Sequence, residues 1–181
     1  MRADRLDRIA AAEQDHFWFE ARRNVVIDEV TRRRPDHRNV RMLDVGCGTG
    51  SMLDAIGANA SSVGLDPLGH HLPQRARGPR FGRARTEALP VRSETIDLIL
   101  ALDVLEHVDD RLAIREFTRC LKPGGVFIGT VPAGPRLWSY RDDDAGHLRR
   151  YRRVDLRATV SSGGLIVEQC RAFQGVLMPL L

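Results

Sequence analysis

Glycines two residues apart follow a short apolar run in the first third of the chain, at Gly46, Gly48 and Gly50. An apolar run of this length that ends at glycine is typical of a buried strand in a parallel sheet. Glycine permits backbone angles closed to other residues and lets a ligand approach the main chain closely. A helix is expected next, capped by Thr49 or Ser51. The pattern predicts either a nucleotide site at the carboxyl edge of a parallel sheet or a tight turn without a ligand.

Acidic residues at or near the ends of three apolar runs form the second group suited to bind a ligand. Asp66 ends the second run, twenty residues beyond Gly46. At this separation a strand–helix–strand unit places a carboxylate against the hydroxyls of a ribose. An aspartate that caps a helix ahead of Pro67 is the alternative interpretation. Asp44 lies in the first run, and Asp103 follows the most strongly apolar run of the chain. Each of the three is a candidate ligand-binding residue.

Two segments outside this alternation concentrate aromatic, histidine and arginine side chains. The first, residues 16–23, contains three consecutive aromatic residues in a chain that is only 6% aromatic. Neighbouring residues on a helix point about 100° apart, so one helix face cannot bury all three. The segment is either part of the core with one ring at a hinge, or a lid over a substrate pocket. The second, residues 132–153, is a long polar insertion, and such loops are more often functional than idle.

The surrounding pattern predicts an α/β fold with a doubly wound, mostly parallel sheet, because apolar runs alternate with helical segments. The expected strands are residues 40–45, 62–66, 80–85, 96–102, 126–131 and 165–173. The expected helices are residues within 4–34, the segment after Gly50, residues 109–121 and residues 154–162. We expect a helical lid over residues 1–38 and one α/β domain over residues 39–181.

The charge and hydropathy patterns argue against several classes of protein. The 181 residues carry a formal net charge of +4, and Lys122 is the only lysine. The arginine runs are typical of solvated faces, and no aromatic residues interleave a basic motif, so nucleic acid is not favoured as a partner. No apolar run approaches the ~20 residues of a membrane span, and the charged N-terminus does not resemble a signal peptide. We therefore expect a cytoplasmic protein.

The residues that most often bind metals are not arranged as a metal site in the sequence. Three cysteines, at positions 47, 120 and 170, are far apart and odd in number, which argues against a disulfide framework and against a zinc site. The adjacent residues His70 and His71 point in different directions in either regular structure, so we expect them to be exposed. We therefore predict no metal site.

Five short motifs, in this order, resemble those of class I S-adenosylmethionine-dependent methyltransferases and together cover most of that domain. They are Leu43–Gly50, Gly64–Asp66, Glu87–Pro90, Asp103–Val108 and Leu121–Gly125. Two further segments, Phe17–Arg23 and Gly146–Tyr151, resemble a subgroup near the ubiquinone-type O-methyltransferases. The resemblance implies a Rossmann-like fold and S-adenosyl-L-methionine as the cofactor.

The resemblance also implies how the turn and the acids would hold the cofactor. The backbone of the glycine turn would meet the methionine and ribose parts of the cofactor, through Gly46, Cys47, Gly48 and Gly50. Asp66 would accept hydrogen bonds from both ribose hydroxyls, and Asp103 would lie near the methionyl end. Asp44 would orient the amino group, directly or through water.

Three other positions complete the implied cofactor site. Arg22 or Arg23 would pair with the cofactor's carboxylate through the fork of the guanidinium. An acid that meets adenine in many relatives is replaced here by Arg85. Adenine contact would then rest on the backbone around Thr86 and Glu87.

The resemblance implies methyl transfer to a small-molecule acceptor, with a hydroxyl group as one option. His107 follows the fourth strand at the carboxyl edge and is preferred to His147 as the general base. A capping or packing role is the alternative for His107. Trp18, Trp138 and Tyr140 are expected to meet His147 over the methyl position and to exclude water.

Two other functions share parts of this pattern. An NAD-dependent dehydrogenase would share Asp66 and the sheet, but it requires G-x-G-x-x-G, whereas Gly46 to Gly50 reads G-x-G-x-G. A non-catalytic relative that binds a cofactor or a partner is the second alternative. The family's usual antiparallel seventh strand has no counterpart in the sequence. We therefore expect either a truncated form or a chain whose open sheet edge is completed in a homodimer.

Overall fold

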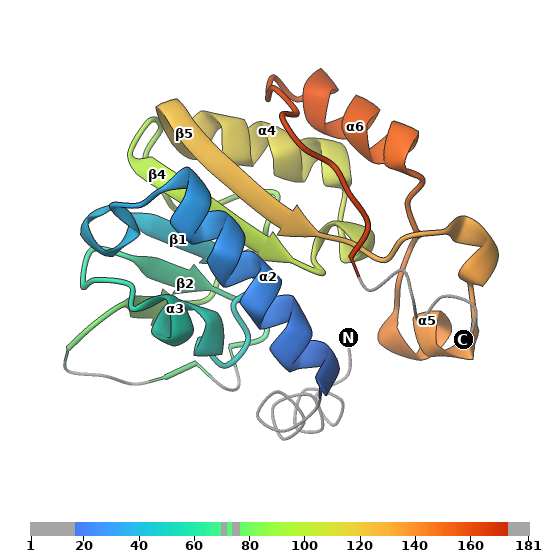
Figure 1. Ribbon diagram of the computed structural model, residues 1–181, viewed down its shortest axis with the longest axis horizontal. Helices are drawn as coiled ribbons and strands as arrows, with labels where there is room; N and C mark the ends of the chain where they lie inside the picture. Colours follow the sequence, from blue (N-terminus) through green and yellow to red (C-terminus); the bar gives the residue numbers. More distant parts are fainter. Residues whose placement is uncertain (1–16, 70–71, 74–76, 174–181) are drawn as a thin grey trace.

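A five-stranded parallel sheet is the centre of the computed structural model, which describes residues 17–69, 72–73 and 77–173 (Figure 1). The strands are β1 (Met42–Val45), β2 (Val63–Leu65), β3 (Arg80–Gly82), β4 (Ile96–Leu102) and β5 (Leu121–Thr130). Their order across the sheet is β3-β2-β1-β4-β5, and every neighbouring pair is parallel. The predicted doubly wound sheet is confirmed. The sheet formed by the described residues contains no antiparallel seventh strand.

Helices cover both faces of the sheet. The longer helices are α2 (Phe17–Arg33), α4 (Asp110–Cys120) and α6 (Arg153–Ser162). The shorter helices are η1 (His37–Asn39), α3 (Ser51–Ile56), η2 (Leu105–His107), η3 (Pro135–Leu137) and α5 (Tyr140–Ala145). Apolar side chains of α2 and α3 pack on one face of the sheet, and those of α4 and α6 pack on the other.

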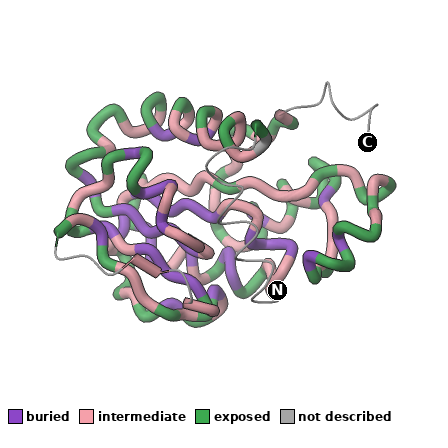
Figure 2. The backbone as a smooth tube through the Cα atoms, turned by 90° about the horizontal axis from the view of Figure 1, so that it is seen from below, coloured by how far each residue is buried: buried purple, intermediate pink, exposed green. Residues whose placement is uncertain are grey.

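The alternation of side chains along β4 explains why this strand is apolar on both faces apart from Asp97 near its start. Leu98 and Leu100 join the cluster under α2 and α3, whereas Ile99 and Ala101 join the cluster under α4. Successive side chains of a strand point to opposite faces, and both faces are covered by helices here. Between Leu98 and Ala101 the strand therefore has no side that faces solvent. Figure 2 shows buried residues gathered along the centre of the fold.

The start of α4 was predicted correctly, whereas the start of α3 was not. Asp109 caps α4, because its carboxylate accepts the backbone N–H groups of Arg111 and Leu112. Gly50 takes the N-cap position of α3 with a left-handed φ of 77° and without a side-chain cap bond. The N-cap residue is therefore Gly50 and neither Thr49 nor Ser51, although the Thr49 hydroxyl accepts the backbone N–H of Ser51 at 3.4 Å. The reason is that the third glycine supplies the turn that a capping side chain would otherwise stabilise.

The polar insertion is more ordered than a loop. Ser139 and Asp142 form a capping box that opens α5, in which each side chain binds the backbone of the other residue. At the far end of the insertion, Tyr151 forms a parallel bridge with Ala133. The insertion is thus fixed at both ends and can hold side chains in defined positions.

The strand expected over residues 165–173 is absent, and this prediction is wrong. The segment is irregular and lies against the C-terminal half of α2, where Arg33 donates hydrogen bonds to Glu168 and Gln169. Arg171 pairs with Glu29 of the same helix. A strand needs regular hydrogen bonds from its N–H and C=O groups to a neighbour. β5 is the edge strand of the sheet, and this segment does not join it as a further strand. Side-chain contacts with α2 hold it instead.

Within the described part of the chain, no helix is long and apolar enough to cross a lipid bilayer.

Val26 and Val30 of α2 share a core cluster with Met42 and Leu53. The C-terminal half of α2 is therefore packed on the sheet, and the lid expected over residues 1–38 stays a prediction. Of this segment, residues 1–16 lie outside the described residues.

Candidate functional site

The glycine turn after β1 leaves one open position at the carboxyl edge of the sheet. Gly46, Gly48 and Gly50 all have left-handed φ angles, of 72°, 51° and 77°. A Cβ at Gly46 would lie 2.5 Å from Val104, and one at Gly50 would lie 2.5 Å from Phe81. A Cβ at Gly48 would meet no atom within 4 Å. Two of the glycines are therefore needed for packing, whereas Gly48 faces open space.

Asp66 lies directly beside this turn. One of its carboxylate oxygens accepts the backbone N–H of Gly48 at 3.2 Å, and the other accepts those of Leu68 at 2.9 Å and Gly69 at 3.3 Å. Asp66 is only 8% exposed. A carboxylate has about four lone-pair sites, so these three contacts leave capacity for a further hydroxyl donor. Asp66 thus combines the expected position with a local capping role.

The remaining residues of the expected cofactor site lie around the same edge. Asp44 is buried in β1, in register with Gly64 on one side and Leu100 on the other. Cys47 is also buried, and its Sγ would lie 2.9 Å from a Cβ at Gly64. Asp44 therefore lies in the middle of the sheet, between β2 and β4, and the side chain of Cys47 lies against β2.

The expected adenine segment follows β3. Thr86 is buried, and Glu87 lies 3.8 Å from the guanidinium of Arg85. Arg85 itself is largely exposed and forms a bridge with Ala88 through the backbone. The loop therefore turns the Arg85 side chain outward and buries Thr86.

Asp103, at the end of β4, is held by residues from two other elements. Its φ angle of 55° is left-handed, which aspartate tolerates better than most residues. Thr130 donates its hydroxyl to one carboxylate oxygen at 2.8 Å, and Arg22 of α2 pairs with the other. Among the described residues, the buried Nε of Arg22 has no hydrogen-bond partner. The pair joins α2 to the sheet edge and leaves one buried N–H of the guanidinium available.

Glu106 is a candidate functional residue that the sequence analysis did not single out. It is 0% exposed, and neither of its carboxylate oxygens has a hydrogen-bond partner among the described residues. Burial, together with the negative charge of Asp103, raises the pKa of Glu106 to about 9. One feature of the sequence could have identified Glu106 as a functional residue, because it lies inside the motif Asp103–Val108. Its complete burial, however, depends on contacts that only the fold creates.

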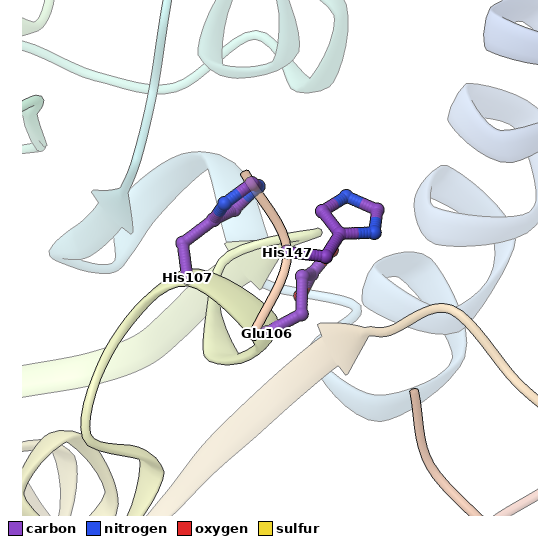
Figure 3. A group of neighbouring side chains, drawn as sticks. All are labelled: Glu106, His107 and His147. Carbon is purple, nitrogen blue, oxygen red and sulfur yellow. The ribbon is translucent and has the colours of Figure 1, made fainter. Parts of the chain in front are cut away.

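His107 and His147 meet beside Glu106, although they come from different elements (Figure 3). Their ring centroids are 4.8 Å apart in an edge-to-face arrangement. Nδ1 of His107 lies 3.2 Å from the carbonyl oxygen of Gly146. Burial lowers the pKa of His107, and the Gly146 carbonyl only partly opposes this effect. The backbone N–H of Leu148 also donates to the carbonyl of Glu106, which ties the two segments together at 2.7 Å.

Asp142 fixes the second histidine. Its carboxylate accepts from Nδ1 of His147 at 2.8 Å and from Nε of Arg150 at 2.7 Å. The backbone N–H of Ser139 donates to it at 2.8 Å. Burial opposes ionisation, but the hydrogen bonds from Arg150, His147 and Ser139 outweigh it and hold the pKa of the Asp142 carboxyl well below its usual range. A buried anion therefore orients the His147 ring.

The aromatic residues expected over the methyl position lie in different surroundings. Trp138 is 40% exposed, and its Nε1 donates to Asp143 at 3.1 Å. Tyr140 is 75% exposed, and the guanidinium of Arg141 lies over its ring. The side chain of Trp18 lies outside the described part of the structure. The acceptor-binding role of all three stays a prediction.

Two surface hollows lie away from this edge. One is lined by Arg41, Asp97 and Lys122 at the amino ends of the strands, and the other lies between α4 and α6 around Arg111 and Arg115. Neither contains a residue of the glycine turn or of the histidine pair. The candidate site is therefore defined by its chemistry, namely an open glycine, ordered carboxylates and oriented histidines at one sheet edge.

Comparison with known proteins places this fold and edge in one family. The family model described as "Methyltransferase domain" matches residues 18–169. The chain belongs to this family, and its fold is that of the class I S-adenosylmethionine-dependent methyltransferases. The predicted family and fold are therefore confirmed.

Two curated relatives and one solved structure illustrate the similarity. The ubiquinone biosynthesis O-methyltransferase of Parvibaculum lavamentivorans is 31% identical over 137 residues, which cover 70% of this chain and 50% of the relative. A probable S-adenosylmethionine-dependent methyltransferase of Mycolicibacterium smegmatis is 30% identical, over 88% of this chain and 63% of the relative. The chain thus spans between half and two thirds of the length of these relatives.

The structural comparison supports the fold alone. Phosphoethanolamine N-methyltransferase 2 of Haemonchus contortus, solved in complex with S-adenosyl-L-methionine, superposes with a TM-score of 0.64 and 18% identity. The superposition covers 80% of this chain and 37% of that protein. At this identity the likeness concerns the fold and carries no information on the acceptor.

Proposed function

We propose that this chain binds S-adenosyl-L-methionine at the carboxyl edge of its sheet and catalyses methyl transfer to a small-molecule acceptor. The observation that carries this proposal is the open, left-handed Gly48 between the Asp66 carboxylate and the Asp103–Arg22 pair. Membership of the methyltransferase-domain family supports it. The absence of a side chain at Gly48 lets a ligand approach the backbone closely, and charged groups lie on either side of it. This arrangement suits a nucleoside with an amino-acid tail.

The residues present fit the two ends of this cofactor. Asp66 would accept one ribose hydroxyl with the lone pair that its three backbone contacts leave, and the second hydroxyl on exchange of one of these contacts. At the other end, Asp103 and Asp44 are carboxylates suited to an ammonium group, and the buried Nε of Arg22 is a donor suited to a carboxylate. Arg23 follows Arg22 on α2 as the second candidate donor. Thr86 and Glu87 would meet the adenine on the far side of the ribose.

The cofactor supplies an activated methyl group on a sulfonium, so the protein's contribution is mainly to position and shield the acceptor. The acceptor atom must lie in line behind the methyl carbon, which the protein achieves by holding both partners at one edge. Water must be excluded, because it competes for the methyl group and weakens electrostatic contacts. These requirements suit a site bordered by α2 and by the ordered insertion.

A hydroxyl acceptor is the finer part of the proposal and follows the printed function of one relative, a ubiquinone biosynthesis O-methyltransferase. A hydroxyl must lose its proton as its oxygen bonds to the methyl carbon. His107 and His147 lie next to Glu106, three residues beyond Asp103, and are the candidates to assist that step. Trp18, Trp138 and Tyr140 are proposed to border the acceptor on the insertion and lid sides.

A methyl-transfer screen tests this proposal. The full chain is first titrated with S-adenosylhomocysteine, and radiolabelled S-adenosylmethionine is then supplied with phenolic, aliphatic hydroxyl, amine and carbon acceptors. We expect label to move to one acceptor class. Binding of S-adenosylhomocysteine without transfer to any acceptor would favour the non-catalytic alternative, and absence of binding would contradict the proposal altogether.

A further inference from the structure

Three potential metal ligands from two separate segments meet at the carboxyl edge. One atom each of Glu106, His107 and His147 lies within 4.8 Å of the others. Glu106 and His107 belong to η2, and His147 follows α5 on the ordered insertion (Figure 3). Two atoms that each bind one ion at about 2.0–2.2 Å are at most about 4.4 Å apart. Separations of up to 4.8 Å therefore require the three side chains to close by a few tenths of an ångström around a single ion.

Both imidazole rings are oriented by acceptors on the same ring nitrogen. Nδ1 of His107 faces the Gly146 carbonyl, and Nδ1 of His147 faces the Asp142 carboxylate. A carbonyl or a carboxylate can only accept, so Nδ1 must carry the proton in each ring. The remaining lone pair of each neutral ring is then on Nε2. Histidines that bind metals are typically held in this way, by a carboxylate or a carbonyl on the other nitrogen.

Glu106 supplies an independent observation that points to a ligand. It is fully buried, and within the described part of the chain no group hydrogen-bonds to its carboxylate oxygens. A buried carboxylate without a partner is costly, and buried charges are normally paired or bound to a metal. Arg22, whose positive charge acts on Glu106, is already paired with Asp103. A cation next to Glu106 would supply the missing partner.

We propose that Glu106, His107 and His147 bind one divalent first-row transition-metal ion, of the kind that combines imidazole and carboxylate ligands, such as Zn²⁺ or Mn²⁺. Two histidines and one carboxylate are a ligand set that such ions accept while keeping further positions open. The proposal departs from our sequence-based prediction of no metal site. That prediction considered residues close in sequence, whereas here the fold joins η2 to the segment after α5.

The position of the ion gives it a role in the proposed function, on which this step rests. An acceptor hydroxyl that binds an open coordination position would have its pKa lowered and would release its proton to water. The oxygen would then form the bond to the methyl carbon, while the carbon–sulfur bond breaks and its electron pair stays on sulfur. The histidines would hold the ion rather than act as the base.

Metal binding to the full chain is the direct test. The protein is treated with a chelator, dialysed, and titrated with Zn²⁺ by calorimetry and with Co²⁺ by visible absorption, which reports coordination by protein ligands. We expect one equivalent of either ion to bind. Glu106→Gln, His107→Ala and His147→Ala should each weaken binding at least tenfold. His37→Ala is the matched control, because His37 contacts the Arg34 carbonyl far from the cluster, and it should bind as the unaltered chain does.

A fourth variant tests the orienting contact. Asp142→Asn removes the charge behind His147 and should weaken metal binding about 10- to 100-fold without changing the stoichiometry. Circular dichroism establishes that each variant is folded, and Glu106→Gln is expected to fold well because the amide has the size and shape of the carboxyl group that it replaces. Absence of stoichiometric binding to the unaltered chain would overturn the proposal. Metal affinities of the three ligand variants equal to that of the unaltered chain would overturn it as well.

The same samples separate this proposal from the proposed function. If the chelated protein transfers methyl groups at an undiminished rate, the metal proposal fails and the methyltransferase proposal stands. If the metal binds through the three residues but no acceptor is methylated, the metal site stands and the proposed function fails.

Discussion

Asp66 serves the backbone as well as the proposed ligand, and its substitution must separate the two roles. Alanine would leave the N–H groups of Gly48, Leu68 and Gly69 without their acceptor as well as remove the ribose contact. Asparagine keeps an oxygen for the backbone but loses the charge. We expect Asp66→Ala to weaken S-adenosylhomocysteine binding five- to 100-fold, about 1–3 kcal/mol, as measured by calorimetry.

The asparagine variant shows which role dominates. If the charge binds the ribose, Asp66→Asn should lose most of the affinity while its unfolding free energy stays close to that of the unaltered chain. Unchanged affinity in a folded Asp66→Asn and a folded Asp66→Ala protein would refute the ribose assignment.

Gly48 allows a matched test of whether the turn is structural or binds a ligand. Gly48 and Gly124 both have left-handed φ angles, of 51° and 76°, and a Cβ at either would meet no atom within 4 Å. Alanine at either position should cost about 1 kcal/mol of stability, because the backbone strain is similar. Only Gly48→Ala should also weaken S-adenosylhomocysteine binding, since Gly124 lies before the apolar part of β5. Equal binding by both variants, measured by calorimetry, would mean that the turn is merely structural.

For single residues, the sequence predicted the place in the fold better than the contacts with other side chains. The spacing of Gly46 and Asp66 was sufficient to place a carboxylate beside the turn, because one strand–helix–strand unit has little freedom. The Arg22–Asp103 pair and the burial of Glu106 were not predictable. Each depends on α2 or the insertion closing over the sheet edge, which is a contact between segments far apart in the chain.

Tyr151 connects elements and is expected to stabilise the insertion. Its hydroxyl lies 2.8 Å from the carboxylate of Asp110 and 3.1 Å from the carbonyl of Leu105, and the residue is buried. Phenylalanine at this position would remove the hydroxyl donor of the buried Leu105 carbonyl, whereas Asp110 would keep its ion pair with Arg149. We expect Tyr151→Phe to lower the unfolding free energy by about 1–3 kcal/mol in urea denaturation.

Tyr140→Phe is the control for this prediction, because Tyr140 is exposed on α5. Its unfolding free energy should change by less than about 0.5 kcal/mol. Equal stability of the Tyr151 and Tyr140 variants would mean that the Tyr151 hydroxyl contributes nothing to the junction of α4, η2 and the insertion.

Glu116 and Arg119 of α4 provide a prediction for pH. Arg119 donates two hydrogen bonds to the Glu116 carboxylate, at 2.8 Å and 2.7 Å, and holds the pKa of that carboxyl below its usual range. A carboxyl whose pKa is lowered on folding stabilises the protein above its unfolded pKa, near 4.5, and this stabilisation is lost as the pH falls through the folded value. Glu116→Gln should therefore cost about 0.5–1 kcal/mol at pH 7 and progressively less below pH 4.5.

Urea denaturation of both proteins between pH 7 and pH 3 measures this difference. A difference that is constant across the range would mean that the ion pair does not contribute. A difference that grows toward low pH would have the wrong sign and would also contradict the account.

Element boundaries were predictable where the local sequence decides them. Asp109 and the apolar spacing after it defined α4. Residues 165–173 have the composition of a strand, yet they form none, because a strand also requires regular backbone hydrogen bonds to a neighbour. The order within the insertion was missed for a related reason, since the capping box of Ser139 and Asp142 spans only one short helix.

At the scale of the whole molecule, the sheet order follows from its apolar runs and its glycine turn. Alternate residues of β1 and β4 supply two separate core clusters, and the chain needs helices on both faces to cover them. This requirement made the doubly wound fold predictable.

A homodimer through an open edge and a division of the chain at residue 38 stay proposals. Light scattering of the purified chain would test the first, since a monomer at all concentrations would exclude it.

The central claim is that the open glycine turn, Asp66 and the Asp103–Arg22 pair form the S-adenosylmethionine site. A crystal structure of the full chain with S-adenosylhomocysteine tests it most directly. The account predicts the ribose hydroxyls within hydrogen-bond distance of the Asp66 carboxylate, backbone contacts at Gly46–Gly48, and the amino-acid tail beside Asp103 and Arg22. A ligand bound at another edge of the sheet, or one whose ribose lies away from Asp66, would contradict it.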